Sequence, residues 1–246
     1  MELKIIASSS SGNCALLRVG EKNFLIDAGL PMKKLSAALE AEGLSASNIS
    51  AIFVTHEHSD HVAGLGGFGG LGIPVYATRG TAEATPVRKE IAWQIIPADS
   101  KFAIGGLMIE SFSIPHDACE PVGYVFEEED ERLVWALDIG HLDSRLKTIF
   151  KSATTLVLES NYCPQLLEAD KKRPWSLKQR IRGRHGHLSN DETFEFLTAE
   201  TSLFWRQIFL AHLSRHCNDV EMLEARYAMT GLPVQVVDPA GEAVSA

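Results

Sequence analysis

The stretch "THEHSDH", residues 55–61, follows the apolar run "AIFV", which is typical of a buried strand. It places three imidazoles and a carboxylate within six residues. In an extended segment side chains repeat every second residue, so His56 and His58 point the same way. A turn after them lets Asp60 and His61 face a second, neighbouring centre. Because imidazole nitrogens with a carboxylate suit Zn²⁺ and, less strongly, Mn²⁺, the stretch predicts a metal site. The alternative is a solvated His-rich loop.

Composition places the chain among ordinary globular proteins. Its 246 residues, 45% of them hydrophobic and 22% charged, suit one large α/β domain over residues 1–246. The four cysteines are scattered without a CxxC pair, which favours a reducing compartment. The first residues lack the apolar core of a signal peptide, and no run reads as a membrane span. We therefore expect a cytoplasmic protein that does not bind membranes.

Short runs rich in β-branched residues alternate with stretches of helical spacing. The runs that predict strands are 3–7, 14–19, 23–29, 51–55, 73–78, 107–114, 122–127, 132–138, 154–159, 207–213 and 233–237. Helices are expected at 32–43, 189–200 and 218–231, the second opening with the capping-box pair Ser189 and Glu192.

The segment "VGYVFEEEDERLVWALD" predicts a hairpin, because an acidic turn joins two adjacent strands. Many strands with interspersed helices indicate an α/β sandwich of two sheets covered by helices. A doubly wound parallel sheet is the alternative. It would show stricter alternation and a phosphate loop, and "GGFGGLG" has neither the Lys-Ser/Thr of a P-loop nor the spacing of a dinucleotide fingerprint.

Three further polar residues follow apolar runs, where strand ends form the rim of a sheet. They are His116, Asp138 and His212. Singly, such a residue is more often structural. With the four of residues 56–61 they make seven candidate ligands, enough for two metal ions. Asp138 could bridge the two ions, and a bridged pair activates a shared water for displacement at phosphorus.

The series HxHxDH, His, Asp, His resembles the metallo-β-lactamase superfamily. Over nearly the whole chain it also resembles the WalJ (YycJ) type branch of that superfamily. The stretches that carry the likeness are "SSSSGNCALL", "LIDAGLPMKKL", "THEHSDH", "IPHDACEPVGY", "DIG", "SLKQRIRGRHGHLSN" and "AHLS". The resemblance implies a four-layer αβ/βα sandwich, a dinuclear site at the sheet edge, and a DNA exonuclease acting from the 5′ end.

Carried over by position, the resemblance assigns the seven ligands. One metal is expected on His56, His58 and His116, and the other on Asp60, His61 and His212, with Asp138 bridging. Zn²⁺ is the first choice and Mn²⁺ the alternative. The catalytic candidates are Asp60, His187 and Glu159.

His187, in "GHLSN", resembles the extra histidine of nucleases in this superfamily and would protonate the leaving oxygen or stabilise its charge. Glu159 could orient it. The alternative for His187 is a residue that merely precedes a helix cap, although Ser189 or Asn190 already supplies that cap.

Substrate contacts are expected at two places. Residues 171–184 carry seven Lys and Arg and no acid, in a chain whose formal net charge is −9. Such a run is usually a solvated face, but beside His187 it predicts binding of a nucleic acid. The resemblance to the exonuclease branch favours DNA over RNA as that nucleic acid. The loop "SSSSGN" is an anion-binding concavity or a plain hairpin turn. The candidate residues are Ser10, Ser11, Asn13, Lys178, Arg180, Arg182, Arg184 and Asn190. Trp175 either stacks on a base or is buried.

Other functions remain open. A thioester hydrolase of the glyoxalase II kind shares the metal motif but gives no role to "GHLSN" or to the basic run. An RNA-processing nuclease is expected to carry a protruding arm rich in Gly and Pro, and a non-enzymatic binder would not need the ligand set. The chain departs from the branch pattern at His141, Tyr162, Cys163 and Cys217, which leaves the substrate contacts open.

Overall fold

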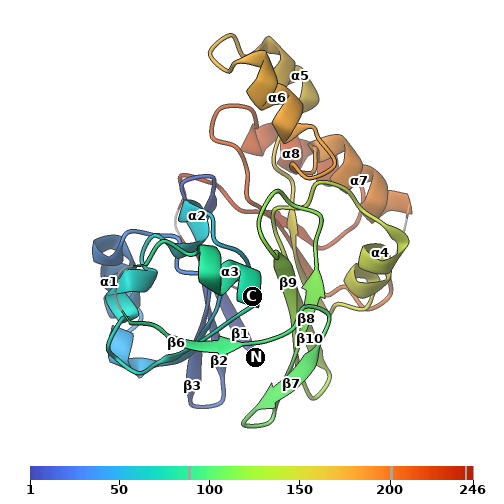
Figure 1. The fold of residues 1–246 in the computed structure, drawn as a ribbon. Helices are drawn as coiled ribbons and strands as arrows, with labels where there is room; N and C mark the ends of the chain where they lie inside the picture. Colours follow the sequence, from blue (N-terminus) through green and yellow to red (C-terminus); the bar gives the residue numbers. More distant parts are fainter. Residues whose placement is uncertain (88–89, 200–201, 242, 246) are drawn as a thin grey trace. The chain divides into compact units, whose positions relative to one another are not determined.

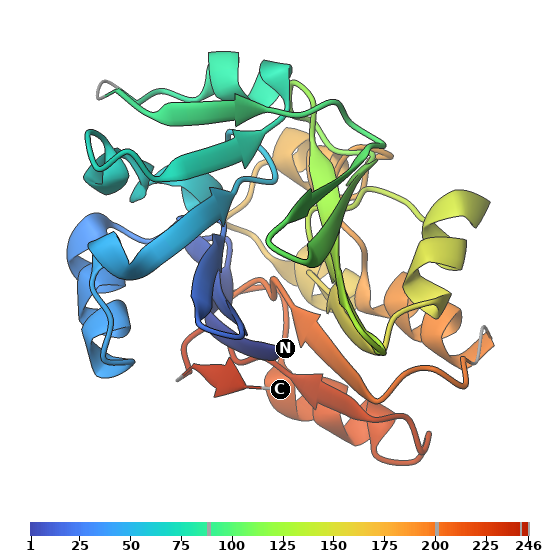
Figure 2. The ribbon, with the colours of Figure 1, turned by 90° about the horizontal axis from the view of Figure 1, so that it is seen from below.

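The strands of the computed structural model form two seven-stranded sheets, one in each of two compact units (Figures 1 and 2). The structure describes residues 1–87, 90–199, 202–241 and 243–245. Unit 1 comprises Met1–Lys101, Ala118–Val122 and Glu242–Ala246, and unit 2 comprises Phe102–Asp117 and Gly123–Gly241. The chain passes between the units repeatedly. We therefore keep one domain of residues 1–246 as a proposal.

Unit 1 holds a mixed sheet with strand order β14-β1-β2-β3-β4-β5-β6. Its strands are β1 (Glu2–Ser9), β2 (Gly12–Val19), β3 (Lys22–Ile26), β4 (Ile49–Phe53), β5 (Pro74–Ala77), β6 (Ala92–Ile95) and β14 (Val244–Ser245). Its helices are α1 (Met32–Ala41), α2 (Ser59–Val62), α3 (Arg79–Ala84) and the 3₁₀ turns η1 (Ala46–Asn48) and η2 (Leu65–Phe68).

Connection length decides strand direction in this sheet. Short turns join β1, β2 and β3, which pair antiparallel, whereas β3 to β6 pair in parallel through longer crossovers. Helix α1 forms the first crossover because Leu35 and Leu39, four residues apart, share one apolar face. Both are buried in a core cluster with strand residues such as Leu25 and Ile52. This core cluster thus supports the sheet and the loop that follows β4.

Unit 2 holds the second mixed sheet, with strand order β13-β12-β11-β10-β9-β8-β7. Its strands are β7 (Lys101–Ile104), β8 (Leu107–Ser113), β9 (Val122–Glu128), β10 (Glu131–Ala136), β11 (Thr155–Glu159), β12 (Gln207–Ala211) and β13 (Val234–Val236). Its helices are α4 (Ser144–Lys151), α5 (Pro164–Ala169), α6 (Trp175–Ile181), α7 (Asn190–Ala199) and α8 (Val220–Tyr227).

The core of unit 2 forms where α4, α7 and α8 pack on the sheet. Phe150, Phe196 and Tyr227, one from each helix, are buried in one cluster with Leu156 and Leu210 of the strands. Strands β10 to β13 run parallel, so their carboxyl ends meet at one edge of the sheet. That edge carries the polar residues considered below.

The α/β fold class predicted from the sequence is confirmed, and each predicted strand is found. The hairpin is confirmed by the pairing of Glu128 with Glu131, and the capping box by the 2.9 Å bond from Ser189 N to Glu192 Oε2. The last residue of the helix predicted at 189–200 lies outside the described residues.

Three strands were not predicted, namely β6, β7 and β14. In β6 the residues alternate in neither polarity nor burial, because the strand lies at a sheet edge. Among the described residues, no helix has the length and apolarity needed to cross a bilayer.

Candidate metal centre

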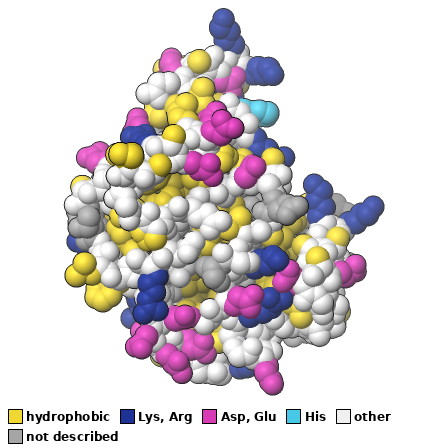
Figure 3. Space-filling view, turned by 180° about the vertical axis from the view of Figure 1, so that it is seen from behind, with side chains coloured by type: hydrophobic (Ala, Val, Ile, Leu, Met, Phe, Trp, Pro, Cys, Tyr) yellow, Lys and Arg dark blue, Asp and Glu magenta, His cyan; other side chains and the backbone are white. Residues whose placement is uncertain are grey.

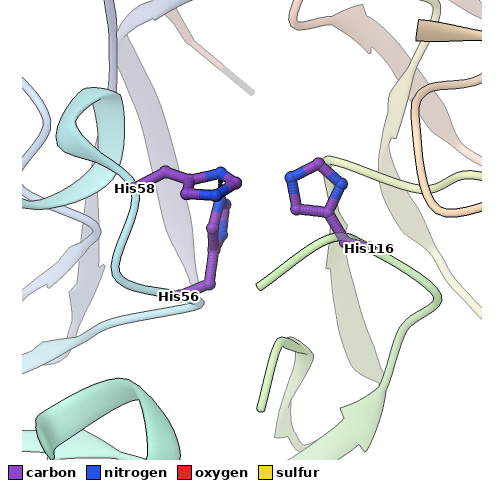
Figure 4. Close-up of side chains that lie close together, drawn as sticks. All are labelled: His56, His58 and His116. Carbon is purple, nitrogen blue, oxygen red and sulfur yellow. Dashed lines mark hydrogen bonds between the residues drawn. The ribbon is translucent and has the colours of Figure 1, made fainter. Parts of the chain in front are cut away.

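The histidines of unit 1 occupy the loop that leaves β4 and enters the short helix α2. The Nε2 atom of His56 lies 3.0 Å from Nδ1 of His58. The ring of His61 lies 4.1 Å from that of His56, measured between centroids. Figure 4 shows His56 and His58 side by side on this loop, and His116 on the loop that follows β8. The structure therefore brings the histidines of the "THEHSDH" stretch together.

A buried carboxylate, Asp27, organises this loop. It accepts hydrogen bonds from the backbone N–H of Thr55 at 2.8 Å and from Nδ1 of His61 at 2.7 Å. Burial raises the pKa of Asp27, while His61 and the Thr55 donors oppose the rise. Because Nδ1 of His61 donates to the carboxylate, its Nε2 keeps a lone pair.

Two neighbours face that second nitrogen of His61. The amide nitrogen of Asn13 lies 3.1 Å from Nε2, and Oδ2 of Asp60 lies 3.7 Å from it. The main chain is also close, because a Cβ added to Gly29 would stand 1.7 Å from the carbonyl oxygen of Asp60. Only glycine fits there, so the β3–α1 loop holds α2 in place.

In unit 2 four polar side chains meet at the carboxyl ends of the strands. One donor atom from each lies within 4.8 Å of the others, and the residues are Asp138, Glu159, His187 and His212. Asp138 follows β10, Glu159 ends β11 and His212 follows β12. Asp138 and His212 have φ of 58° and 56°, in the left-handed region that non-glycine residues rarely adopt. Asp27 of unit 1 shares this conformation, with φ of 58°.

Glu159 is fully buried and accepts four hydrogen bonds. Its Oε1 lies 2.8 Å from Nδ1 of His187 and 2.8 Å from Nδ1 of His212. Its Oε2 accepts the backbone N–H groups of Ile139 and Leu188 at 2.9 and 3.0 Å. In its neutral form each ring thus has Nε2 as its acceptor nitrogen, the arrangement that carboxylates impose on metal-binding histidines.

Electrostatics in this group favour opposite charges. Burial pushes the pKa of Glu159 upward, but the charges and hydrogen bonds of His187 and His212 outweigh burial and hold it below its ordinary value. Burial likewise pushes the pKa of His187 downward, but the carboxylates of Glu159 and Asp138 outweigh burial and raise it. His187 therefore holds a proton more readily than an ordinary imidazole.

His116 belongs to the same edge of unit 2. Its Nδ1 donates to the carbonyl of Gly186 at 3.1 Å, and its Nε2 lies 3.7 Å from Oδ1 of Asp138. Burial lowers the pKa of His116, with Asp138 opposing. Desolvation therefore favours the neutral ring, the form in which histidine binds metals.

The residues expected to contact the substrate differ in their burial and in their partners. Lys178 is buried, and its Nζ donates to the carbonyl of Glu168 at 2.7 Å, so the structure speaks against its prediction as a substrate contact. Arg180 pairs with Asp117, and Arg182 lies 2.7 Å from Glu168. The basic run folds partly into α6, where Lys178 is buried and Arg180 and Arg182 have acidic neighbours.

Arg184 lies close to His141, one of the residues at which the chain departs from the branch pattern. Nη2 of Arg184 is 3.2 Å from Nε2 of His141, whose Nδ1 donates to the carbonyl of Arg184. His141 therefore engages the chain just before His187.

Asn190 is buried, with its side-chain amide bonded to Asn218 at 2.8 Å and to Ser160 at 2.9 Å. It is a structural residue of the α7 start, and this corrects its prediction as a substrate contact. The helix cap comes from Ser189 with Glu192, so His187 is not part of it.

In the loop between β1 and β2, Ser10 and Ser11 are exposed. The backbone N–H groups of Ser9 and Ser11 donate to Asn13 Oδ1 and Ser9 Oγ within the loop. Asn13 is buried, so the loop has the bonding of a hairpin turn.

Two residues that position the histidines were not predicted from the sequence. Asp27 accepts hydrogen bonds from His61 and Thr55, and Asn161 donates one to the carbonyl of His212. Asp27 ends the apolar run "NFLID", a signal of the same kind that indicated Asp138. Asn161 donates to the carbonyl of His212 at 2.7 Å, and no local signal pointed to it.

Comparisons with known proteins agree with this geometry. Residues 22–203 match the family described as "Beta-lactamase superfamily domain", and the chain belongs to that superfamily. It is 35% identical over 235 residues to Exodeoxyribonuclease YycJ of Bacillus anthracis, covering 90% of this chain and 86% of the relative. It is 33% identical to Exodeoxyribonuclease WalJ of Streptococcus pneumoniae, covering 89% and 83%. These matches confirm the resemblance to the WalJ type branch.

Solved structures confirm the fold. The metallo-β-lactamase fold protein YhfI from Bacillus subtilis aligns with a TM-score of 0.73 and 16% identity, over 100% of this chain and 99% of that one. Zn²⁺-bound PqqB from Methylobacterium extorquens aligns with a TM-score of 0.72 and 18% identity, over 100% and 99%. The chain thus has the metallo-β-lactamase fold, and unit 2 holds a candidate metal-binding group, Asp138, Glu159, His187 and His212.

Proposed function

We propose that the chain is a metal-dependent DNA exonuclease that works from the 5′ end. The observation that carries the proposal is the hydrogen bonding of the imidazoles: carboxylates hold Nδ1 of His61 and of His212, which makes Nε2 the acceptor nitrogen of each ring. The named activity of the relatives, matched over most of the chain, supports DNA as the substrate.

The donor set fits two divalent ions. It consists of imidazole nitrogens and carboxylates without thiolates, which suits Zn²⁺ first and Mn²⁺ second. The proposed ligands of one ion are His56, His58 and His116; those of the other are Asp60, His61 and His212, with Asp138 shared. When bound, such a pair would lower the pKa of a water for attack on phosphorus. Asp60 contacts both His61 and Asn13, so its carboxylate is held in place.

His187 would manage the proton of the leaving group. Glu159 holds Nδ1–H of the ring at 2.8 Å and favours the charged imidazolium, so Nε2 can carry a proton to the departing oxygen. Afterwards the carboxylate keeps the ring in the same orientation for reprotonation. Glu159 also contacts His212, so the proton donor and a proposed metal ligand share one carboxylate.

Nucleic acid would enter beside His187. Arg184, two residues before Gly186, is exposed and bonded to His141, and Arg180 and Arg182 are exposed with acidic neighbours that a phosphate can replace. Four free cysteines support a cytoplasmic location, because thiols persist in reducing compartments.

A second candidate is RNA processing. The chain is 30% identical to Ribonuclease Z of Mycolicibacterium gilvum over 146 residues, which cover 55% of this chain and 48% of that protein. Partial coverage ranks this function below DNA hydrolysis. Glyoxalase II-like thioester hydrolysis ranks lower still, since it uses neither His187 nor the cations near it.

One experiment tests the proposal. Protein loaded with Zn²⁺ or Mn²⁺ is given single- and double-stranded DNA and RNA labelled at either end, and a small thioester in parallel. We expect mononucleotides released from the 5′ end of DNA, and protection when the 5′-terminal linkages are phosphorothioates. Cleavage of RNA in preference to DNA, protection only by 3′-terminal linkages, or turnover of the thioester alone would reject it.

A further inference from the structure

The segment 164–182, called the arm below, leaves unit 2 and returns to it at the same place. Tyr162 pairs with Ser189 across its base, and Cys163 N donates to Cys217 O at 2.8 Å. Its helices, α5 and α6, stand at the top of unit 2 in Figure 1. The end of α6 is tied to the candidate site, because His187 N donates to the carbonyl of Ile181 at 2.9 Å.

The start of α6 exposes an unusual amount of apolar surface. Trp175, the first residue of the helix, is 58% exposed, and Leu177 is 36% exposed. A hollow of about 530 Å³ lies at this end of the arm. Its lining combines apolar and charged side chains: Leu166, Ala169, Asp170, Lys172, Arg173, Pro174, Leu177 and His216. Trp175 follows directly on Pro174 of this lining, and the hollow is large enough for part of a flat aromatic ligand.

The structure gives a reason why Trp175 is not buried. The small core of the arm is already filled by Tyr162, Leu167 and Cys217, with Leu166 and Ile181 packed against it. A tryptophan in an ordinary core buries about 150–250 Å², so leaving one 58% exposed forgoes much of that burial. Exposed apolar surface of this kind is typical of a binding surface.

Charge around the recess favours an anion. In the turn between the helices, Arg173 pairs with Asp170, and the N–H of Lys172 donates to the same carboxylate. The side chains of Lys171 and Lys172 are exposed, and neither forms an ion pair with another described residue. Figure 3 shows Lys and Arg side chains at the outer end of the arm, with hydrophobic side chains beneath them.

We propose that the arm binds an unpaired base of a nucleic acid strand, stacked on Trp175, with Lys171 and Lys172 on the flanking phosphates. This rests on the proposed function and names a site for its substrate. Stacking on an aromatic ring needs an exposed base face, which a duplex does not offer, so the occupant is a single-stranded segment. Lys171 and Lys172 precede Trp175 by four and three residues, so cations and an aromatic ring succeed one another along the chain as phosphate and base do along such a strand.

The length of α6 sets the distance from the chemistry. At ~1.5 Å per residue the helix from Trp175 to Ile181 spans about 10 Å. This equals about three steps of a strand at the ~3.4 Å rise of duplex DNA, and fewer steps of a more extended single strand. The arm would therefore hold the strand a few nucleotides from the phosphate that meets His187, and so would favour substrates with an unpaired end.

The test measures binding without cleavage. The metal-loaded protein is titrated with a 12-nucleotide oligothymidine whose linkages are all phosphorothioates, and with a blunt duplex of the same length and chemistry. We expect Trp175→Ala to weaken binding of the single strand by about 5- to 100-fold, the usual worth of one stacked base, and binding of the duplex by less than about threefold. Trp175→Phe should restore most of the affinity.

Phe204→Ala is the matched control, because Phe204 is 64% exposed and precedes β12, at the opposite end of the strand from His212. It should change neither affinity. Equal affinities of Trp175→Ala and Phe204→Ala for the single strand overturn the inference, as does equal weakening for both nucleic acids. If the wild-type chain binds the oligonucleotide through Trp175 yet cleaves no DNA, the proposed function fails and the arm's role stands.

Discussion

The candidate groups of the two units hold their imidazoles in place with different parts of the chain. In unit 1, His56, His58 and His61 come from one loop, and Asp27 holds His61 by Nδ1. In unit 2 the polar residues come from segments far apart in the chain, and Glu159 holds two imidazoles by Nδ1. The spacing along the chain therefore differs between the two groups. What they share is a carboxylate at the end of a strand, Asp27 or Glu159, that holds imidazoles by Nδ1.

The largest expected effect is on Asp138, which the proposal places on both ions. Asp138→Ala should lower turnover by about 10⁴-fold, because metal ions contribute several kcal/mol of transition-state stabilisation. Elemental analysis should show fewer than two ions per chain. Asp130→Ala, in the exposed turn between β9 and β10, is the control and should keep both. A fully active Asp138→Ala protein with two ions would contradict the bridging assignment.

His187 separates proton transfer from metal binding within unit 2. His187→Ala should lower turnover by about 10²–10⁴-fold, the usual range for loss of an acid–base group, and leave the metal content unchanged. His185→Ala, two residues away and exposed, should retain activity. Loss of an ion from His187→Ala would make this residue a ligand, and unchanged turnover would remove it from the mechanism.

The two carboxylates that hold the imidazoles can be compared directly. Asp27→Asn and Glu159→Gln should each weaken metal affinity by about 10–100-fold, the usual effect of losing a carboxylate behind a ligating histidine. Glu159→Gln should also lower turnover at saturating metal, because it holds His187 as well. Competition with a chelator measures the affinities. If Asp27→Asn bound metal like the wild type, the parallel between the two units would be wrong.

The smallest effects separate cations that stabilise the arm from cations that could contact phosphate. Lys178→Met should lower the free energy of unfolding by about 1–3 kcal/mol, because the Glu168 carbonyl loses its buried donor. Chemical denaturation measures this loss, and the salt dependence of DNA binding should not change.

Changing Lys171 and Lys172 together to Gln should do the reverse. Stability should hold within about 0.5 kcal/mol, as for other exposed positions. The log–log slope of affinity for single-stranded DNA against salt should become shallower by about 1.4. An unchanged slope would show that neither lysine meets a phosphate.

The sequence predicted what is encoded locally. A single loop carries the histidines of unit 1, and alternating apolar runs indicated every central strand. Residues joined only by topology were harder to find: Asp27 and Asn161 act through contacts 28 or more residues away. The run "NFLID" marks Asp27 as a strand-end residue but not its partners, and no local signal points to Asn161. Lys178 was misjudged because a charge run does not reveal which side chain folds inward. The edge strand β6 was missed because little of it is buried.

The left-handed backbone at Asp27, Asp138 and His212 sets the stability of the fold against the activity of the site. For a residue with a Cβ this conformation costs about 1–2 kcal/mol, and glycine avoids the cost. Replacing these residues with glycine would remove the backbone cost, but it would also remove the side chains that carry the chemistry. The polar groups at these three strand ends therefore carry a local backbone cost that glycine would not have.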